Sequence, residues 1–119
     1  MLNYMLQETK KLLLALGITP NYDGYDYLVT AIKLVILYPD MLHALTKELY
    51  PAIAKEHKTT SMCVEKSLRL ACKIAWEKGN RALLNKLMGT TVIEKPKNGQ
   101  MIGILSISIH ALLAESDQP

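Results

Sequence analysis

The stretch that decides the fold runs from Leu49 to Trp76 and reads LYPAIAKEHKTTSMCVEKSLRLACKIAW. Its second half repeats small and apolar residues at i, i+4, i+7, i+8 and i+11, which is the spacing of one face of a helix: Val64, Leu68, Ala71, Cys72 and Ala75. A polar turn precedes this helix, with Thr60 or Ser61 as its N-cap. Before the turn, Ile53 and Ala54 supply the packing face of a shorter helix. The pattern predicts a helix-turn-helix.

The outer face of the second predicted helix carries five residues, three of them basic: Met62, Glu65, Lys66, Arg69 and Lys73. In a helix-turn-helix this face enters the DNA major groove. Hydroxyls and free N–H groups at the helix start commonly fix the register on phosphates, and a carboxylate can accept a hydrogen bond from cytosine N4. An ordinary amphipathic helix with a basic solvated face is the alternative. The predicted DNA-binding residues are Lys58, Thr59, Thr60, Ser61, Met62, Cys63, Glu65, Lys66, Arg69 and Lys73.

The remaining sequence predicts an all-α fold, a single six-helix domain over residues 1–119. Gly17 suits the C′ position of a first helix, Pro39 ends a second, and Asp40 and Asn80 are candidate N-caps for later ones. From Gln100 on, Ile and Ser alternate as in a strand, but length and context favour a helix that ends in a polar tail. The expected helices span residues 3–16, 24–38, 40–57 with a break near Pro51, 61–78, 80–88 and 100–114. At the break, Tyr50-Pro51 is either a kink or the start of a separate short helix.

Composition narrows the class of protein. Half of the residues are hydrophobic, with no Phe and one Trp, which indicates a helical core of Leu, Ile, Val, Ala and Met. The net charge of +3 is compatible with nucleic acid but does not argue for it alone. The start lacks the pattern of a signal peptide, and the apolar runs are too short to span a bilayer. We therefore expect a cytoplasmic protein without a membrane partner.

No catalytic or metal-ligating pattern stands out. The three histidines are scattered singly, and carboxylate pairs, nucleophile motifs and Gly-rich phosphate loops are missing from the sequence. Cys63 and Cys72, nine residues apart on one predicted helix, fit neither a disulfide framework nor a zinc site. We expect no enzyme activity, cofactor, metal or small-molecule substrate. Trp76 is interpreted as a core anchor, and a redox role for Cys63 is a secondary hypothesis.

The same stretch resembles the C-terminal effector domain of the sporulation stage-zero response regulator family. The resemblance covers roughly residues 10 to 113. It rests on Leu45-Thr46-Lys47, Leu49-Tyr50-Pro51, Ile53-Ala54-Lys55, Thr59-Thr60, Val64-Glu65, Arg69, Ala71, Ala75-Trp76 and Gly79-Asn80. Upstream it extends to Leu16-Gly17-Ile18, Gly24 to Leu28 and Ala31-Ile32, and downstream to Leu87-Met88-Gly89 and Lys95 to Asn98.

This resemblance implies a six-helix fold that binds tandem sites containing a TGTCGAA-like box, with head-to-tail pairing of two copies on DNA. It implies base reading at Glu65 and Lys66 and a retained basic residue at Arg69. It also implies contact with the sigma subunit of RNA polymerase near the fifth helix, for which the candidate residues are Lys78, Asn80, Arg81 and Leu84. The chain departs from the family where Cys63 and Lys66 replace arginines, which puts the target sequence in doubt.

Three questions stay open at this stage. The family's receiver domain is absent from these residues, so the chain is either a cut-out domain or an orphan effector. The apolar last helix is either a dimer contact or a buried central helix. The alternative function is a divergent helical interaction module that binds a regulator or polymerase subunit without reading DNA.

Overall fold

A computed structural model describes residues 2–116 and forms six α-helices there, with no strand in that range. Residues 1 and 117–119, which the predicted domain and its polar tail include, lie outside the described part of the chain. The α-helices are α1 (Leu2–Leu16), α2 (Asp23–Leu37), α3 (Tyr50–His57), α4 (Ser61–Glu77), α5 (Arg81–Met88) and α6 (Asn98–Ser116). Two irregular turns join α2 to α3: the 3-10 segment η1 (Pro39–His43) and the π-helical segment η2 (Leu45–Leu49).

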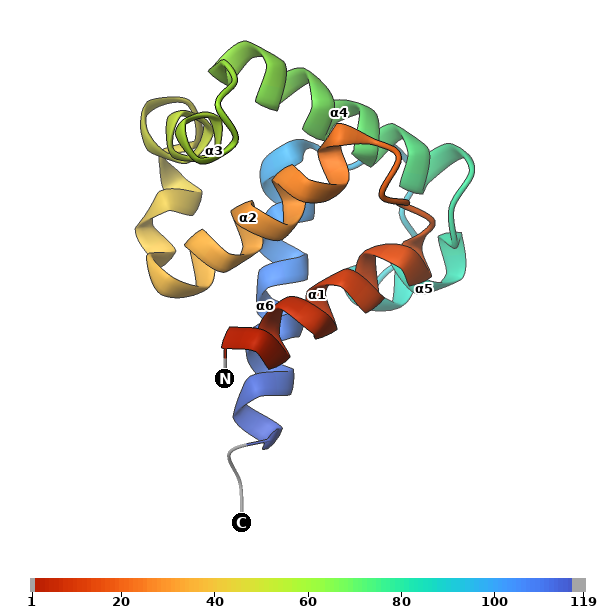
Figure 1. Ribbon diagram of the computed structural model, residues 1–119. Coiled ribbons are helices and arrows are strands. Elements are labelled where there is room, and N and C mark those ends of the chain that lie inside the picture. Colours follow the sequence, from red (N-terminus) through yellow and green to blue (C-terminus); the bar gives the residue numbers. More distant parts are fainter. Residues whose placement is uncertain (1, 117–119) are drawn as a thin grey trace.

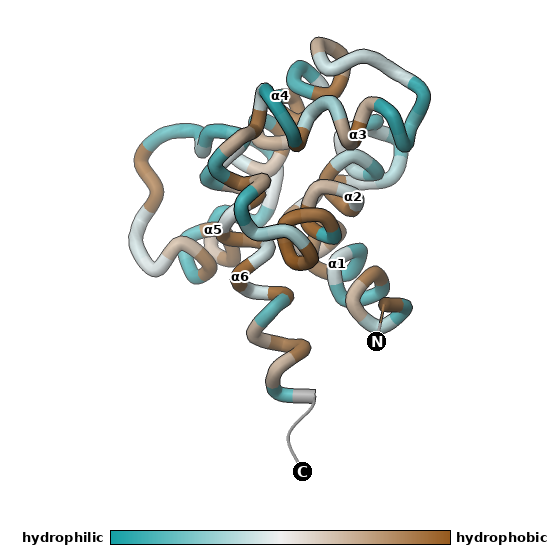
Figure 2. The backbone as a smooth tube through the Cα atoms, turned by 90° about the vertical axis from the view of Figure 1, so that its left-hand side faces the viewer, coloured by the Kyte–Doolittle hydropathy of each residue, from teal (hydrophilic) through white to brown (hydrophobic). Residues whose placement is uncertain are grey.

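Helix α2 lies at the centre of the fold and packs against α4 on one side and against α1 and α6 on the others (Figure 1). The first half of α6 passes through the core, where Met101, Ile102 and Leu105 have no exposed surface. Its last turns project away from the body of the molecule in both views (Figures 1 and 2). The core is therefore one cluster shared by all six helices, and it fixes α4 against α2.

Close helix packing depends on two glycines. A Cβ atom on Gly24 of α2 would lie 2.5 Å from the backbone oxygen of Ser67 in α4 and 3.0 Å from the Cβ of Ala71. A Cβ on Gly79, just after α4, would overlap the backbone oxygen of Leu16 at the end of α1. The missing side chains let α1, α2 and α4 approach at backbone distance.

Five helices begin and end within two residues of their predicted ranges. Gly17 has φ +93°, as expected of a residue that ends a helix. The segment 100–114, with its strand-like alternation, is helical. Hydroxyls make the serines compatible with this helix, because Ser106 Oγ and Ser108 Oγ donate to the carbonyl oxygens four residues earlier.

One part of the predicted third helix is wrong: it does not run unbroken from residue 40, since the chain breaks at Ala44, whose φ and ψ are −141° and 54°. Of the two alternatives at Tyr50-Pro51, the start of a separate short helix is confirmed, because α3 begins at Tyr50. Pro51 lies at the start of α3, where its missing N–H group costs little. The π-helical turn of η2 comes directly before α3. Asp40 is not an N-cap, because it lies inside η1, whose N-cap position is Tyr38.

Candidate nucleic-acid interface

Helix α3, the turn at residues 58–60 and helix α4 form a helix-turn-helix. The five residues of the predicted inner stripe, Val64, Leu68, Ala71, Cys72 and Ala75, are all buried. Ile53 and Ala54 of α3 are buried as well. Thr60 is the N-cap of α4, and its Oγ1 accepts a hydrogen bond from the N–H of Cys63 at 3.1 Å. Packing and capping together hold α4 with its opposite face outward.

The turn itself is tight and carries backbone strain. Lys58 has φ 55° and ψ 49°, and it is the one non-glycine residue with positive φ in the described range 2–116. A side chain in this left-handed region costs about 1 kcal/mol or more. The N–H of Thr59 donates to the oxygen of Ala54 at 2.9 Å and closes the end of α3. This geometry lets α4 begin with only three residues between it and the end of α3.

The ten predicted DNA-binding residues lie in the turn and along α4. Three of them are half-buried: Thr59, Ser61 and Glu65. Seven are exposed: Lys58, Thr60, Met62, Cys63, Lys66, Arg69 and Lys73. Met62 is 66% exposed, which is high for a methionine and leaves an apolar side chain on the same surface. The turn and α4 therefore present cations, hydroxyls and the apolar side chain of Met62 outward, and Leu70 of α4 is exposed as well.

Glu65 and Arg69 form an ion pair with each other on α4. The pair is at i, i+4, so their side chains meet on one face of the helix. The carboxylate of Glu65 is consequently occupied in the free protein. Sequence reasoning treated the two residues as separate ligands for DNA, although their spacing is a recognised signal for such a pair.

A groove of about 310 Å³ beside α4 contains functional candidates that sequence reasoning missed. Glu65 and Arg69 line one side, and the basic segment before α6 lines the other. Asn98 joins the two sides, because its Nδ2 donates to the backbone oxygen of Glu65 at 3.2 Å and to the hydroxyl of Tyr50 at 3.1 Å. The Lys-Pro-Lys run at 95–97 was visible as basic, but its position next to α4 depends on the tertiary fold.

The two cysteines differ in exposure and in the pKa of the thiol. Hydrogen bonds from the Thr60 and Thr59 side chains lower the pKa of the exposed Cys63 thiol. Burial raises the pKa of Cys72 to about 11, so that thiol stays protonated. Both are free.

A polar network ties the end of α3 to α2. Thr30 Oγ1 lies 2.9 Å from Glu56 Oε2 and 2.7 Å from His57 Nε2, and Lys33 Nζ lies 2.9 Å from Glu56 Oε1. Hydrogen bonding by Lys33 lowers the pKa of Glu56. The ring of Tyr27 meets that of His57 edge-on at 5.1 Å. These contacts hold the last turn of α3 directly before Lys58.

The predicted polymerase-contact residues differ in how exposed their side chains are. Lys78 is exposed, and Asn80 caps α5 by accepting from the N–H of Leu83 at 3.0 Å. Arg81 stacks on Trp76, with Cζ 3.3 Å from the ring centroid, and its Nη2 donates to the Trp76 oxygen at 2.6 Å. Trp76 is thus half-buried under Arg81 rather than deep in the core. Leu84 is a correction: it has no exposed surface, so its side chain packs in the core and cannot reach a partner.

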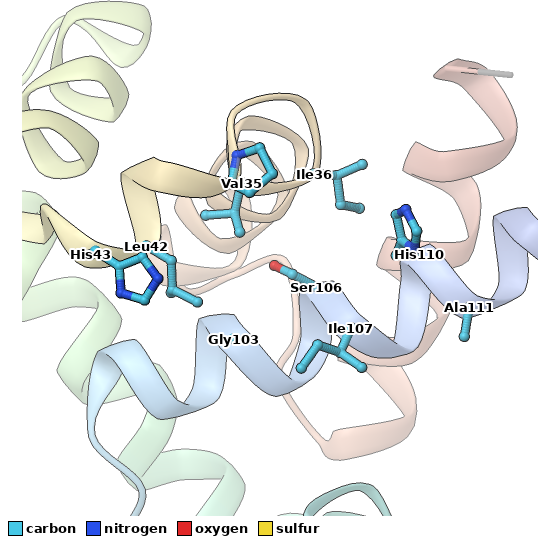
Figure 3. A pocket seen from close by; sticks show the side chains of 10 residues that line it. Val35, Ile36, Leu42, His43, Gly103, Ser106, Ile107, His110 and Ala111 are labelled. Carbon is cyan, nitrogen blue, oxygen red and sulfur yellow. The ribbon is translucent and has the colours of Figure 1, made fainter.

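Helix α6 is a buried central helix along its inner face, and the dimer-contact interpretation stays a prediction. Its inner residues are buried, but Ile107 is 65% exposed. An apolar pocket of about 460 Å³ lies between this helix and the end of α2. Figure 3 shows Val35 and Leu42 facing Gly103 and Ser106 across it. His43 and His110 lie at the rim, and both are exposed.

Within residues 2–116, no three His, Cys, Asp or Glu side chains are grouped so that they could hold a metal ion. The helices in that range are also all too short or too polar to cross a membrane.

The comparison with known proteins agrees with this geometry. A family model described as "Sporulation initiation factor Spo0A C terminal" matches residues 9–109, which is most of the chain. The match includes the whole helix-turn-helix and the groove beside it.

Proposed function

From the chain's membership of the Spo0A C-terminal family, the DNA-binding effector domains of the sporulation regulator, we propose that it regulates transcription by sequence-specific binding of duplex DNA through α4. The observation that carries this proposal is the division of α4 into a buried inner stripe and an outer face with three exposed cations, Lys66, Arg69 and Lys73. A helix held in this way can enter the major groove without losing its packing.

The two kinds of contact fall on different residues. Lys58, Thr60 and Ser61 surround the N-terminus of α4, where free N–H groups and the helix dipole favour a phosphate. Glu65 and Lys66 follow one turn later, and we assign them to base edges, a carboxylate for cytosine N4 and an ammonium for guanine. Contacts of the first kind set the position, and those of the second kind set the sequence.

Cys63 distinguishes this chain from the family pattern. A thiol is a weak, short donor and cannot hold guanine O6 and N7 together as an arginine does. We propose that the domain recognises a relative of the family's box with less discrimination at one guanine. Its affinity for other DNA should be similar, since the exposed cations remain.

Two partners follow from family membership and belong to this proposal. A second copy is expected to bind head-to-tail at tandem boxes. The sigma subunit of RNA polymerase is expected to contact the exposed surface around Lys78, Asn80 and Arg81, with Leu84 excluded by its burial.

Salt dependence of duplex binding tests the proposal. With about four to six phosphates neutralised, log K against log salt concentration should have a slope near −4 to −5. Arg69→Ala and Lys73→Ala should weaken binding to all sequences. A flat dependence, or no binding of any duplex at low salt, would reject DNA binding and leave the protein-interaction module as the better hypothesis.

A further inference from the structure

The groove beside α4 lies outside the helix-turn-helix proper but opens next to its outer face. Three cations line it: Arg69 and Lys97, which are exposed, and Lys95, which is half-buried. Glu65 is the single acidic residue among those that line it. We propose that this groove binds a backbone phosphate of the same DNA duplex, so that the segment before α6 is a second DNA-binding element. This inference rests on the proposed function and names a contact that the helix-turn-helix does not supply.

Asn98 holds the second element in place. Its side chain bonds to the Glu65 carbonyl and the Tyr50 hydroxyl, and Cys72 Sγ donates to its Oδ1 at 3.6 Å. Burial raises the pKa of Tyr50, which keeps the hydroxyl protonated. The neighbouring Pro96 is buried. The backbone that carries Lys95 and Lys97 is thus fixed before DNA arrives, so little conformational entropy remains to be lost on binding.

The electrostatic surroundings favour an anion. The groove includes Asn98 and Gly99 at the first turn of α6, a helix of 19 residues whose positive dipole end lies there. The Lys97 N–H donates to Gln100 Oε1 at 2.9 Å, so this turn is ordered. Phosphate is the occupant because the groove flanks the cationic outer face of α4, and the duplex backbone runs beside a helix whose outer face lies in the major groove.

Phosphate binding in the groove would also change how Glu65 reads DNA. In the free protein Arg69 is paired with Glu65, and both residues line the groove. A phosphate offers Arg69 an alternative partner, which it can also bind through two parallel N–H···O bonds. Transfer of Arg69 from Glu65 to the phosphate leaves the carboxylate free to accept from a base. Backbone binding and base reading are therefore coupled through one arginine.

The first test compares Lys97→Gln with Lys10→Gln in binding to a 20-base-pair duplex of random sequence. Lys10 is an exposed lysine of α1, which lies across α2 from α4 (Figure 1). Lys97→Gln should weaken binding several-fold and make the salt slope shallower by about 1. Lys10→Gln should leave the slope unchanged. If the two substitutions have equal effects, or if Lys97→Gln has none, the groove does not bind a backbone phosphate.

The second test addresses the coupling. Glu65→Gln should tighten binding to the same random duplex more than Glu77→Gln does, because Glu77 is an exposed carboxylate of α4 that lines no part of the groove. In an Arg69→Gln background that extra gain should disappear. If the gain persists undiminished without Arg69, the two residues do not exchange partners and the coupling is wrong.

The outcomes separate the two proposals. If the wild-type domain binds no duplex, both the proposed function and phosphate binding in the groove are rejected. If the wild type binds with a steep salt slope and Lys97→Gln binds identically, the proposed function stands and the groove alone is rejected.

Discussion

Adding one methyl group at Gly24 should destabilise the protein even though the change favours helix formation. Gly24 is the second residue of α2 and does not have positive φ, so alanine suits its backbone. Replacing glycine by alanine in a helix contributes about 0.5–1 kcal/mol of stability. Here the new Cβ would lie 2.5 Å from the Ser67 oxygen, a backbone atom that no rotamer change can move.

The steric cost should exceed the gain. Overpacking of this kind costs about 1–3 kcal/mol, so we expect Gly24→Ala to lower the free energy of unfolding by about 1–2 kcal/mol. Gly99→Ala is the matched control, because Gly99 is the second residue of α6 and its Cβ would meet the Leu45 Cδ1 atom at 3.1 Å, the end of a flexible side chain. That variant should be neutral or slightly stabilised.

Urea denaturation followed by circular dichroism measures both free energies. The Gly24→Ala midpoint should fall below that of the wild type, with an unchanged slope against urea concentration. A wild-type or higher midpoint for Gly24→Ala would show that α4 is not held at backbone distance from α2. The position assigned to the outer face of α4 would then be wrong.

Three further predictions concern charge, thiol chemistry and specificity. Hydrogen bonding by Lys33 lowers the pKa of Glu56 from its ordinary 4.5, so its stabilisation is present above that pH and is lost as pH falls through the lower folded value. In Glu56→Gln, stability measured by circular dichroism should therefore fall less steeply as pH is lowered. An unchanged loss of stability in acid would argue against a stabilising contribution from ionised Glu56. A thiol reagent should modify exposed Cys63 rapidly and buried Cys72 only on unfolding, as intact-mass spectrometry can follow, and equal rates would contradict their assigned burial. Cys63→Arg should restore preference at one guanine by about 1–3 kcal/mol, measured by competition between single-base variants, whereas equal tightening to every base would mark the new arginine as a phosphate contact.

Local sequence patterns predicted those features of the fold that depend on residues close together in the chain. The inner stripe of α4 follows from periodicity, and the Thr60 and Asn80 caps follow from residue type and position. The break at Ala44 was missed because proline is the stronger helix-breaking signal in this part of the sequence. Pro51 does not break the helix here, since proline fits the first turn of a helix.

Tertiary contacts account for most of what the sequence did not reveal at the site. Asn98 reaches the carbonyl of Glu65, 33 residues away along the chain, and no local pattern announces that contact. Leu84 was named as a polymerase contact from the family resemblance, and it is buried in the core. The Glu65–Arg69 pair is the exception, because its i, i+4 spacing could have been recognised.

The central claim is that α4 reads base sequence, and selection of bound duplexes from a random library tests it most directly. The wild-type domain should enrich one motif, with a cytosine preference that Glu65→Gln weakens and that Glu77→Gln leaves intact. Binding to the library without enrichment of any motif would contradict the claim, since α4 would then hold only the phosphate backbone.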